Sequence, residues 1–319
     1  MPVAQRTSLE VAGRLLSISN ADKVLWPRDG FTKGDLIAYY RAVAPYIIPY
    51  LQGRPLTLER FPDGIDGEAW WEKNAHRGLP AWIPTIAVHS SGGRHDTISF
   101  MVCNDESALV YVANLAGIVL HVWTSREPTL DVPDFILFDL DPWEGCTLAN
   151  LATVAIAFRD ALHEIGLAPL IKTTGGSGFH VLIPLQPRYD YDLIKGFGEL
   201  IAQRINGLLP KRTTLERMTK NRPAGTVYLD WVQVGKGKTL VAPFSVRARD
   251  GAPVSMPLEW ETVAAMRRKR SKETEAEMLR WTIRNVPGLL AKGGDPWADG
   301  WKPQRLEPAL KNARLLWSS

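Results

Sequence analysis

The sequence predicts an α+β fold in which mostly antiparallel sheets are flanked by helices. Segments with helical periodicity are interspersed with short runs of β-branched and aromatic residues, and several of these runs follow one another as hairpin-like neighbours. Strict strand–helix alternation, which would indicate a parallel sheet, is missing. The 319 residues are 45% hydrophobic and 23% charged, which is typical of a globular protein with a sizeable core.

Helices are expected where apolar residues recur every three or four positions. They cover residues 33–50, 106–118, 148–165 and 192–208, and the sequence turns helical and polar again after residue 255. Thr147 is placed to cap the third of these helices and Gly166 to end it. Strands are expected at residues 55–62, 98–102, 135–142, 170–174, 179–185 and 226–234.

Charge and cysteine content narrow the class of protein. The net charge of +4 and the isoelectric point of about 9.0 permit a nucleic-acid partner without requiring one. The basic run from Arg267 to Lys272 is expected to be a solvated helix face. Two cysteines without metal-binding spacing argue against structural zinc and disulfides. With no apolar run of membrane-spanning length and no secretory signal, an intracellular enzyme is expected.

Three aspartates on two predicted strands form the clearest chemical pattern. Asp139 and Asp141, in FILFDLDP, are two apart on one strand and therefore project from the same face. Asp230, in TVYLDWVQV, is again a carboxylate among strand-forming apolar residues. Carboxylates forced together repel one another unless a cation neutralises them, and oxygen ligands suit Mg²⁺ or Mn²⁺. The alternative is that these strand positions simply face solvent.

A glycine-rich turn joins two further predicted strands, in KTTGGSGFHV from Lys172 to Val181. Glycines let backbone amides approach a phosphate, and Thr174, Ser177 and His180 could donate hydrogen bonds to a triphosphate. A tight hairpin turn gives the same pattern, and the segment is not a P-loop because GK[ST] is absent. His121, in the middle of an apolar strand, also fits a buried core histidine.

Trp70 and Trp71 are adjacent aromatic residues beside Lys73 in EAWWEKN. Adjacent strand residues face opposite sides, so at most one of the two indoles is expected in the core. An exposed tryptophan is a platform on which a nucleobase can stack. The alternative is an ordinary half-buried pair.

Several segments in one order resemble a single family. They are NADKVLWP at 20–27, RPLTLERFPDG at 54–64, WWEKN at 70–74, HVWTSR at 121–126, FDLDP at 138–142, KTTGGSGFHV at 172–181, YLDW at 228–231 and APFSVRARDGAPVSMPLEW at 242–260. They resemble the polymerase domain of ligase D, the bacterial and archaeal end-joining enzyme, within the archaeo-eukaryotic primase superfamily. The resemblance implies a primase-like fold as one domain over residues 1–319, with its core at 15–262 and a helical extension at 263–319 packed on it.

The resemblance also implies roles for individual residues. Asp139, Asp141 and Asp230 match the metal-binding catalytic acids. The residues implied at the incoming nucleotide are Arg60, Trp70, Trp71, Lys73, His121, Thr174, Ser177, His180, Gln233 and Arg247. Asn20, Lys23 and Lys33 match a pocket for a downstream DNA 5′-phosphate, and Arg222 matches an arginine near the metal site and the primer end.

The chain departs from the family pattern in several respects. Thr174 replaces a serine, and Ser177 replaces a lysine, which removes one positive charge expected near the triphosphate. The segment between Arg222 and Asp230 is one residue longer than usual, and the aromatic pair is Trp-Trp where Phe-Phe is common. No KxDG ligase motif is present.

The function that the resemblance implies is repair synthesis at gaps and double-strand breaks in non-homologous end joining. Two Mn²⁺ or Mg²⁺ ions are expected, with DNA carrying a downstream 5′-phosphate and nucleoside triphosphates as substrates, ribonucleotides being preferred. Expected partners are Ku and a separate ligase, with no membrane, in the cytoplasm at the nucleoid. The rival functions are a primase that starts strands without a primer, a non-catalytic DNA-end-binding module and a metal-dependent nuclease.

Overall fold

The computed structural model describes residues 6–89, 97–269 and 274–317. The chain divides into two compact units, each assembled from separate segments. Unit 1 comprises Met1–Glu127, Thr239–Ser255 and Trp281–Gly293, and unit 2 comprises Pro128–Lys238, Met256–Arg280 and Gly294–Ser319. Each of the two larger sheets lies within one unit.

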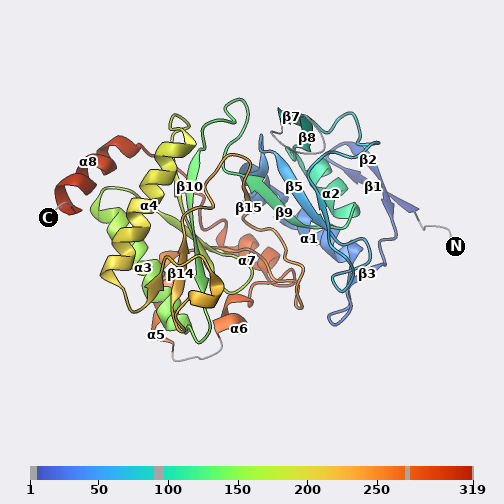
Figure 1. The fold of residues 1–319 in the computed structure, drawn as a ribbon. Helices are drawn as coiled ribbons and strands as arrows, with labels where there is room; N and C mark the ends of the chain where they lie inside the picture. The colour runs from blue at the N-terminus through green and yellow to red at the C-terminus, as the bar shows by residue number, and fades with distance from the viewer. Residues whose placement is uncertain (1–5, 90–96, 270–273, 318–319) are drawn as a thin grey trace. The chain divides into compact units, whose positions relative to one another are not determined.

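Unit 1 is built on a sheet in which the strand order is β15-β9-β5-β8-β7, with β6 paired to β5 off this path (Figure 1). The strands of unit 1 are β1 (Arg6–Val11), β2 (Arg14–Ser19), β3 (Val24–Trp26), β4 (Phe31–Thr32), β5 (Leu56–Arg60), β6 (Trp70–Glu72), β7 (Thr85–His89), β8 (Thr97–Met101), β9 (Gly117–Trp123) and β15 (Thr239–Val241). Of these, β1 pairs with β2 and β3 pairs with β4 in two smaller sheets. Its helices are α1 (Lys33–Leu51), α2 (Glu106–Asn114) and α7 (Val286–Gly293).

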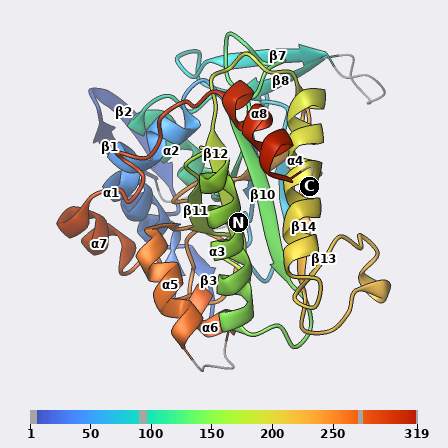
Figure 2. The ribbon, with the colours of Figure 1, turned by 90° about the vertical axis from the view of Figure 1, so that its left-hand side faces the viewer.

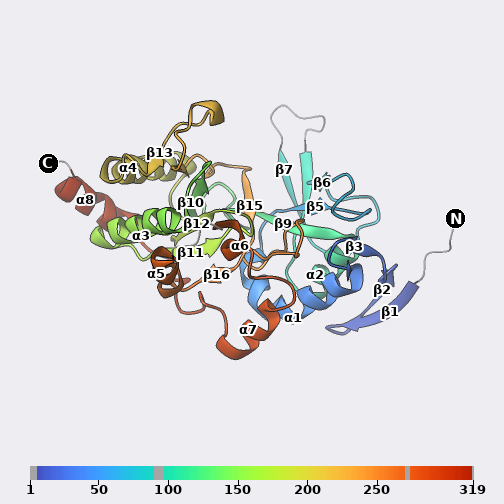
Figure 3. The same cartoon turned by 90° about the horizontal axis from the view of Figure 1, so that it is seen from below.

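Helices α1 and α2 cover one face of this sheet (Figure 3). The Tyr40 hydroxyl of α1 donates to the Ile118 carbonyl of β9, which ties the helix to the sheet. α1 begins with a capping box in which Thr32 and Asp35 satisfy each other's backbone amides. Its apolar stripe, which includes Leu36, is buried in the core of the unit.

Unit 2 is built on a second sheet, in the order β13-β14-β10-β12-β11-β16. Its strands are β10 (Phe135–Pro142), β11 (Leu170–Thr173), β12 (Phe179–Pro184), β13 (Thr213–Thr214), β14 (Val227–Asp230) and β16 (Pro257–Leu258). Its helices are α3 (Leu148–Glu164), α4 (Tyr191–Leu208), the 3₁₀ turn η1 (Thr219–Asn221), α5 (Trp260–Arg268), α6 (Thr274–Met278) and α8 (Leu306–Trp317).

Helices α3 and α4 lie along the same face of the second sheet (Figure 2). Phe138 of β10 packs against Phe158 of α3 with ring centroids 5.0 Å apart. Phe138 and Leu140 are buried on this face. Because strand side chains alternate, Asp139 and Asp141 must project from the opposite face of the sheet, away from α3.

Most predicted elements are confirmed. The pairs in both larger sheets are antiparallel except β13 with β14, as expected for the α+β class. The Thr147 side chain accepts from the Asn150 amide and so caps α3, and Gly166 follows its end with a φ of +87°.

Two predicted boundaries are wrong. The helix expected to reach residue 118 ends at Asn114, because Ala116 takes a left-handed φ of +56° and Gly117 begins β9. A Cβ on Gly117 would come within 2.8 Å of the Val112 side chain, so the chain turns back tightly there. The strand expected at 226–234 ends at Asp230, whose carboxylate accepts from the Val232 amide and starts a turn.

Two predictions extend beyond what the structure describes. The basic run includes Arg270 and Lys272, which lie outside the described residues, and so does part of the predicted helical extension. The single-domain prediction itself stays a prediction. Within the described residues, no helix has the length and apolar character needed to cross a bilayer.

Candidate functional site

The strand register of unit 2 brings the three predicted acids onto one sheet face. Asp139 of β10 is the direct cross-strand partner of Asp230 of β14, and Asp141 lies two residues further along β10 opposite Tyr228. Direct partners share a face, and residues two apart share it too. Antiparallel pairing of β10 with β14 therefore brings Asp139 and Asp230 together, although they are 91 positions apart in the sequence.

The three acids interact electrostatically. Burial raises the pKa of the Asp141 carboxyl to about 7, with the negative charges of Asp139 and Asp230 adding to the rise. The guanidinium of Arg222 opposes the rise. Arg222 is held near the acids because its guanidinium lies 3.8 Å from the ring centroid of Tyr228, the cross-strand partner of Asp141.

The acid cluster continues across the sheet as a row of ionisable residues. Asp139 pairs with His180 of β12, and His180 pairs with Lys172 of β11. The His180 Nε2 atom lies 3.5 Å from Asp139 Oδ1. Lys172 is fully buried, with its Nζ 3.5 Å from the Thr173 carbonyl. The row thus has a lysine at one end and two aspartates at the other.

The donor set fits a divalent cation. Three carboxylates provide only oxygen ligands, which Mg²⁺ and Mn²⁺ prefer, and a cation would relieve the repulsion that raises the Asp141 pKa. Asp230 accepts hydrogen bonds from the Val232 amide and from Gln233 Nε2 at 3.0 Å, which orient its carboxylate and leave lone pairs. As they stand, no three His, Cys, Asp or Glu side chains within the described ranges are gathered closely enough to hold one metal ion.

The glycine-rich turn after β11 is closed by Thr174. Its hydroxyl accepts from the amides of Gly176 and Gly178, and its own amide donates to the Gly178 carbonyl. Ser177 lies exposed at the turn. A Cβ on Gly178 would meet the Leu140 carbonyl of β10 at 2.5 Å, so glycine there lets the turn approach the strand that carries the acids.

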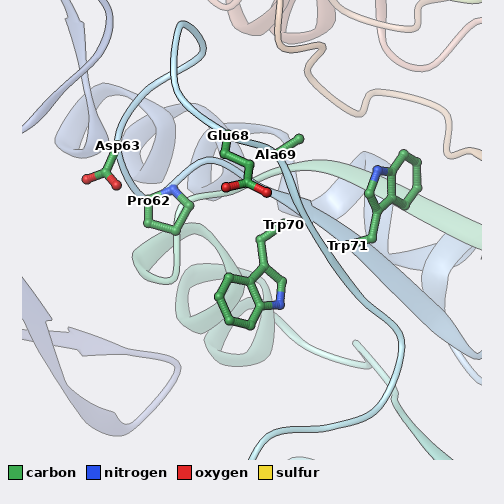
Figure 4. A pocket seen from close by; sticks show the side chains of 6 residues that line it. All are labelled: Pro62, Asp63, Glu68, Ala69, Trp70 and Trp71. Carbon is green, nitrogen blue, oxygen red and sulfur yellow. The ribbon is translucent and has the colours of Figure 1, made fainter. Parts of the chain in front are cut away.

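Trp70 and Trp71 form an exposed aromatic pair on unit 1, with 65% and 53% of their surfaces accessible. Their indoles project to opposite sides of β6 (Figure 4). A pocket of about 460 Å³ lies beside them and includes Asp63 and Glu68 in its lining. Both indoles are exposed, which goes further than the expectation that at most one would be in the core.

His121 and Trp71 lie together on one face of the unit 1 sheet. Their ring centroids are 4.9 Å apart, and His121 Nε2 lies 3.5 Å from Glu59 Oε2. The register explains the grouping because Thr57 is the partner of His121 and Glu59 is the partner of Trp71. His121 is nearly buried, as a core histidine would be, yet one of its faces is next to an exposed indole.

Arg60 points elsewhere. Its Nε donates to the Leu115 carbonyl at 2.9 Å, and its guanidinium bonds to the buried carboxylate of Glu72. A register shift between Glu59 and Arg60 accompanies this placement. The structure therefore does not bring the Arg60 guanidinium into the group formed by His121 and Trp71.

Lys73 and Arg247 also belong to unit 1. Lys73 is exposed directly after β6. Arg247 is partly exposed in the loop after β15, where its amide donates to the Pro253 carbonyl.

Asn20, Lys23 and Lys33 converge through backbone contacts. The Lys23 amide donates to the Asn20 carbonyl at 3.1 Å, and the Lys33 amide donates to the Lys23 carbonyl at 2.8 Å. Asn20 has a left-handed φ of +48°, which asparagine tolerates. Lys23 pairs with Asp63, whereas the nearly buried Lys33 donates to Ser19 and to the Asn114 carbonyl. Burial, and then the charge of Lys23, lowers the pKa of Lys33 to about 8.

Sequence reasoning missed two carboxylates on unit 1. Glu59 contacts His121, and Glu72 is buried against Arg60 and His76. By strand alternation Glu72 lies on the same side of β6 as Trp70, and nothing in the sequence indicated that Glu72 would be buried. No sequence pattern indicated its partners.

Comparison with known proteins places the chain in a family. The family described as LigD, primase-polymerase domain, matches residues 32–297. The chain is 34% identical over 250 residues to a multifunctional non-homologous end joining protein LigD of Mycolicibacterium smegmatis, covering 77% of this chain and 32% of that protein. It is 30% identical over 298 residues to the bifunctional LigD protein of Bacillus subtilis, covering 92% of this chain and 45% of that one.

A solved structure is similar over most of the chain. The polymerase domain of Mycobacterium tuberculosis ligase D, in complex with DNA, matches with a TM-score of 0.80 and 32% identity, covering 89% of this chain and 97% of that one. The chain spans a third to less than half of the length of the relatives named above. The predicted resemblance and primase-like α+β fold are thus confirmed, and the chain belongs to the LigD primase-polymerase domain family, as a primase-like nucleotidyltransferase.

Proposed function

We propose that this chain extends primer 3′ ends at gaps and broken ends of DNA during non-homologous end joining. The observation that carries the proposal is the grouping of Asp139, Asp141 and Asp230 on one sheet face in a chain of this family. The DNA bound in the solved mycobacterial relative supports DNA as the partner here.

Enzymes of this family depend on metal ions, and the three acids are the residues that would hold two of them, with Mn²⁺ favoured over Mg²⁺. When bound, the metals lower the pKa of the primer hydroxyl and neutralise charge on the departing pyrophosphate. The chain's own contribution is to keep three carboxylates aligned. Gln233 and the Val232 amide orient Asp230, and β10 fixes the spacing of Asp139 and Asp141.

Nucleotide-binding roles are proposed for residues of each unit, taken separately. On unit 2, His180 and the turn containing Thr174 and Ser177 would donate hydrogen bonds to phosphate oxygens. On unit 1, His121, Lys73 and Arg247 would contact the nucleotide, and Trp70 and Trp71 would stack against bases of the nucleotide or template. Arg222, beside the acids, would steady the primer end. A preference for ribonucleotides belongs to the same proposal.

The downstream 5′-phosphate would be bound by Asn20, Lys23 and Lys33. Lysines attract a phosphate as point charges, and the amino end of α1, which starts at Lys33, adds a favourable dipole. Lys23 would exchange its surface partner Asp63 for the phosphate. Ku and a separate ligase are proposed as partners because the named relatives are end-joining proteins. The nucleoid localisation stays a prediction.

A gapped duplex with either a 5′-phosphate or a 5′-hydroxyl downstream tests this function. We expect extension with Mn²⁺, faster with ribonucleotides than with deoxynucleotides, and tighter binding to the phosphorylated gap. The double variant Lys23→Ala/Lys33→Ala should lose the phosphate preference and still extend a simple primer–template. Synthesis without a primer would favour a primase, degradation without nucleotide a nuclease, and DNA binding with no chemistry an end-binding module.

A further inference from the structure

Glu72 is a buried carboxylate on β6, directly after the tryptophan platform, which is defined here as Trp70 and Trp71. It is 7% exposed, while the two residues before it on β6 are mostly exposed. Burying a carboxylate costs several kcal/mol unless charged or hydrogen-bonding partners compensate. Glu72 has such partners on both of its oxygens.

The first partner is Arg60 of β5. Its guanidinium bonds to Glu72 Oε2, and its Nε donates to the Leu115 carbonyl at the end of α2. Arg60 is also the cross-strand partner of Trp70. The arginine therefore connects β6 to both the neighbouring strand and the helix behind it.

The second partner is His76, which follows β6 by four residues. Its Nδ1 lies 2.7 Å from Glu72 Oε1, and its Nε2 lies 2.9 Å from the Tyr111 hydroxyl of α2. Burial, and then the charge of Glu72, raises the pKa of Tyr111, so the phenol keeps its proton and can donate to the imidazole. The contacts thus run from the Leu115 carbonyl, directly after α2, through Arg60, Glu72 and His76 to Tyr111 of α2.

Strand β6 needs such an anchor. It has three residues, and within the described part of the chain it pairs with β5 alone. The indoles bury little surface because both are largely exposed, although the Trp71 ring also packs against His121. After β6, the side chain of Asn74 accepts a hydrogen bond from the Ser99 amide of β8, which holds the segment that follows the strand. The contacts of Glu72 hold β6 itself.

We propose that Arg60, Glu72, His76 and Tyr111 form a hydrogen-bonded clamp that holds the tryptophan platform in position for a nucleobase. Glu72 and His76 are then positioning residues, and Arg60 acts through β6 instead of touching phosphate. The proposal rests on the proposed function for the role of the platform in base stacking. The clamp itself is a property of unit 1 and can be measured without substrate.

Two variants of the full chain test the clamp. Glu72→Gln keeps the shape and removes the charge, and Tyr111→Phe removes one hydroxyl and avoids a gross folding defect. Hydrogen exchange of the amides of residues 70–72 is followed without ligand. A lost charge-assisted bond should accelerate exchange about tenfold in Glu72→Gln, with a smaller acceleration in Tyr111→Phe. The matched control is Glu106→Gln on the same helix α2 as Tyr111, which breaks a surface pair with Arg41 of α1 and should leave these amides unchanged.

Kinetics then separates positioning from general destabilisation. In Glu72→Gln the KM for nucleotide should rise about tenfold while kcat changes by less than about twofold. Added to Trp70→Ala/Trp71→Ala, the same change should raise KM no further, because the platform through which it acts is already gone. Wild-type exchange rates in both Glu72→Gln and Tyr111→Phe, or multiplying effects in the triple variant, would overturn the clamp. If the wild type extends no primer, the proposed function fails, and the exchange rates alone still decide on the clamp.

Discussion

Asp141 is the residue whose surroundings most alter its chemistry. Burial and two neighbouring carboxylates raise its pKa from an ordinary 3.8 to about 7. Between these two pH values the folded protein holds a proton that the unfolded chain releases. The contribution of this carboxyl to stability is therefore present below about pH 4 and is lost as the pH rises to about 7.

The substitution Asp141→Asn should stabilise the metal-free protein at pH 8 by on the order of 2 kcal/mol, because it removes a buried charge repelled by its neighbours. Near pH 4 the variant and the wild type should unfold at similar urea concentrations. Urea denaturation in the presence of a chelator at both pH values measures the difference. A variant less stable than the wild type at pH 8 would show that the three acids do not repel one another.

Lys33 gives a second pH dependence, at the proposed 5′-phosphate pocket. Its pKa of about 8 means that the ammonium is charged at pH 7 and largely neutral at pH 9. The preference for a phosphorylated gap should therefore decline as the pH rises through about 8. In Lys23→Ala the decline should move to higher pH, because a neighbouring like charge is removed. Fluorescence anisotropy with the two gapped duplexes checks this, and an equal preference at pH 7 and 9 would contradict it.

Among the structural elements, the glycine-rich turn and strand β10 depend on each other. A Cβ at Gly178 would meet the Leu140 carbonyl at 2.5 Å, and a backbone atom cannot yield cheaply. Gly178→Ala should therefore push β12 away from β10, reduce stability by about 1–3 kcal/mol and lower activity.

Gly196 in helix α4 is the matched control for this substitution. No atom lies within 4 Å of a Cβ added there, so Gly196→Ala should stabilise the helix by up to ~1 kcal/mol and leave activity unchanged. Thermal denaturation and primer extension of both variants give the comparison. Full activity in Gly178→Ala would mean that the close approach of the turn to β10 is unimportant.

Elements were predictable where one physical signal dominated. The apolar strand ending in two acids, the capped helix after Thr147 and the hairpin around the glycine turn are all present. The predicted ends of a strand and a helix were wrong where local contacts determine where the element stops. Asp230 ends its strand by accepting from the Val232 amide, and the left-handed Ala116 turns the chain before the apolar residues that follow α2.

At the scale of the whole molecule, local sequence patterns indicated the candidate residues but not which of them lie together in space. Asp139 and Asp230 became partners only through the register of β10 and β14, which no local pattern encodes. The direction of the Arg60 side chain was equally hidden, because it depends on a register shift and on the distant carbonyl of Leu115. Family resemblance supplied the grouping of the acids, and the structure supplied the clamp.

Because the chain consists of two compact units, each group of functional residues can be changed separately. The acids and the glycine turn belong to unit 2, whereas the tryptophan platform and the phosphate pocket belong to unit 1. Each set of variants therefore perturbs one unit. Changes to the acids should spare binding to phosphorylated DNA, because Lys23 and Lys33 supply that contact from the other unit.

Primer extension by wild type and Asp139→Asn in Mn²⁺, with binding to gapped DNA measured on the same samples, tests most directly whether the three acids carry the chemistry. We expect the wild type to add nucleotides, and the variant to bind DNA normally while extension falls to background, because one metal ligand is lost. Substantial extension by Asp139→Asn would contradict the assignment of the metal site to the face shared by β10 and β14.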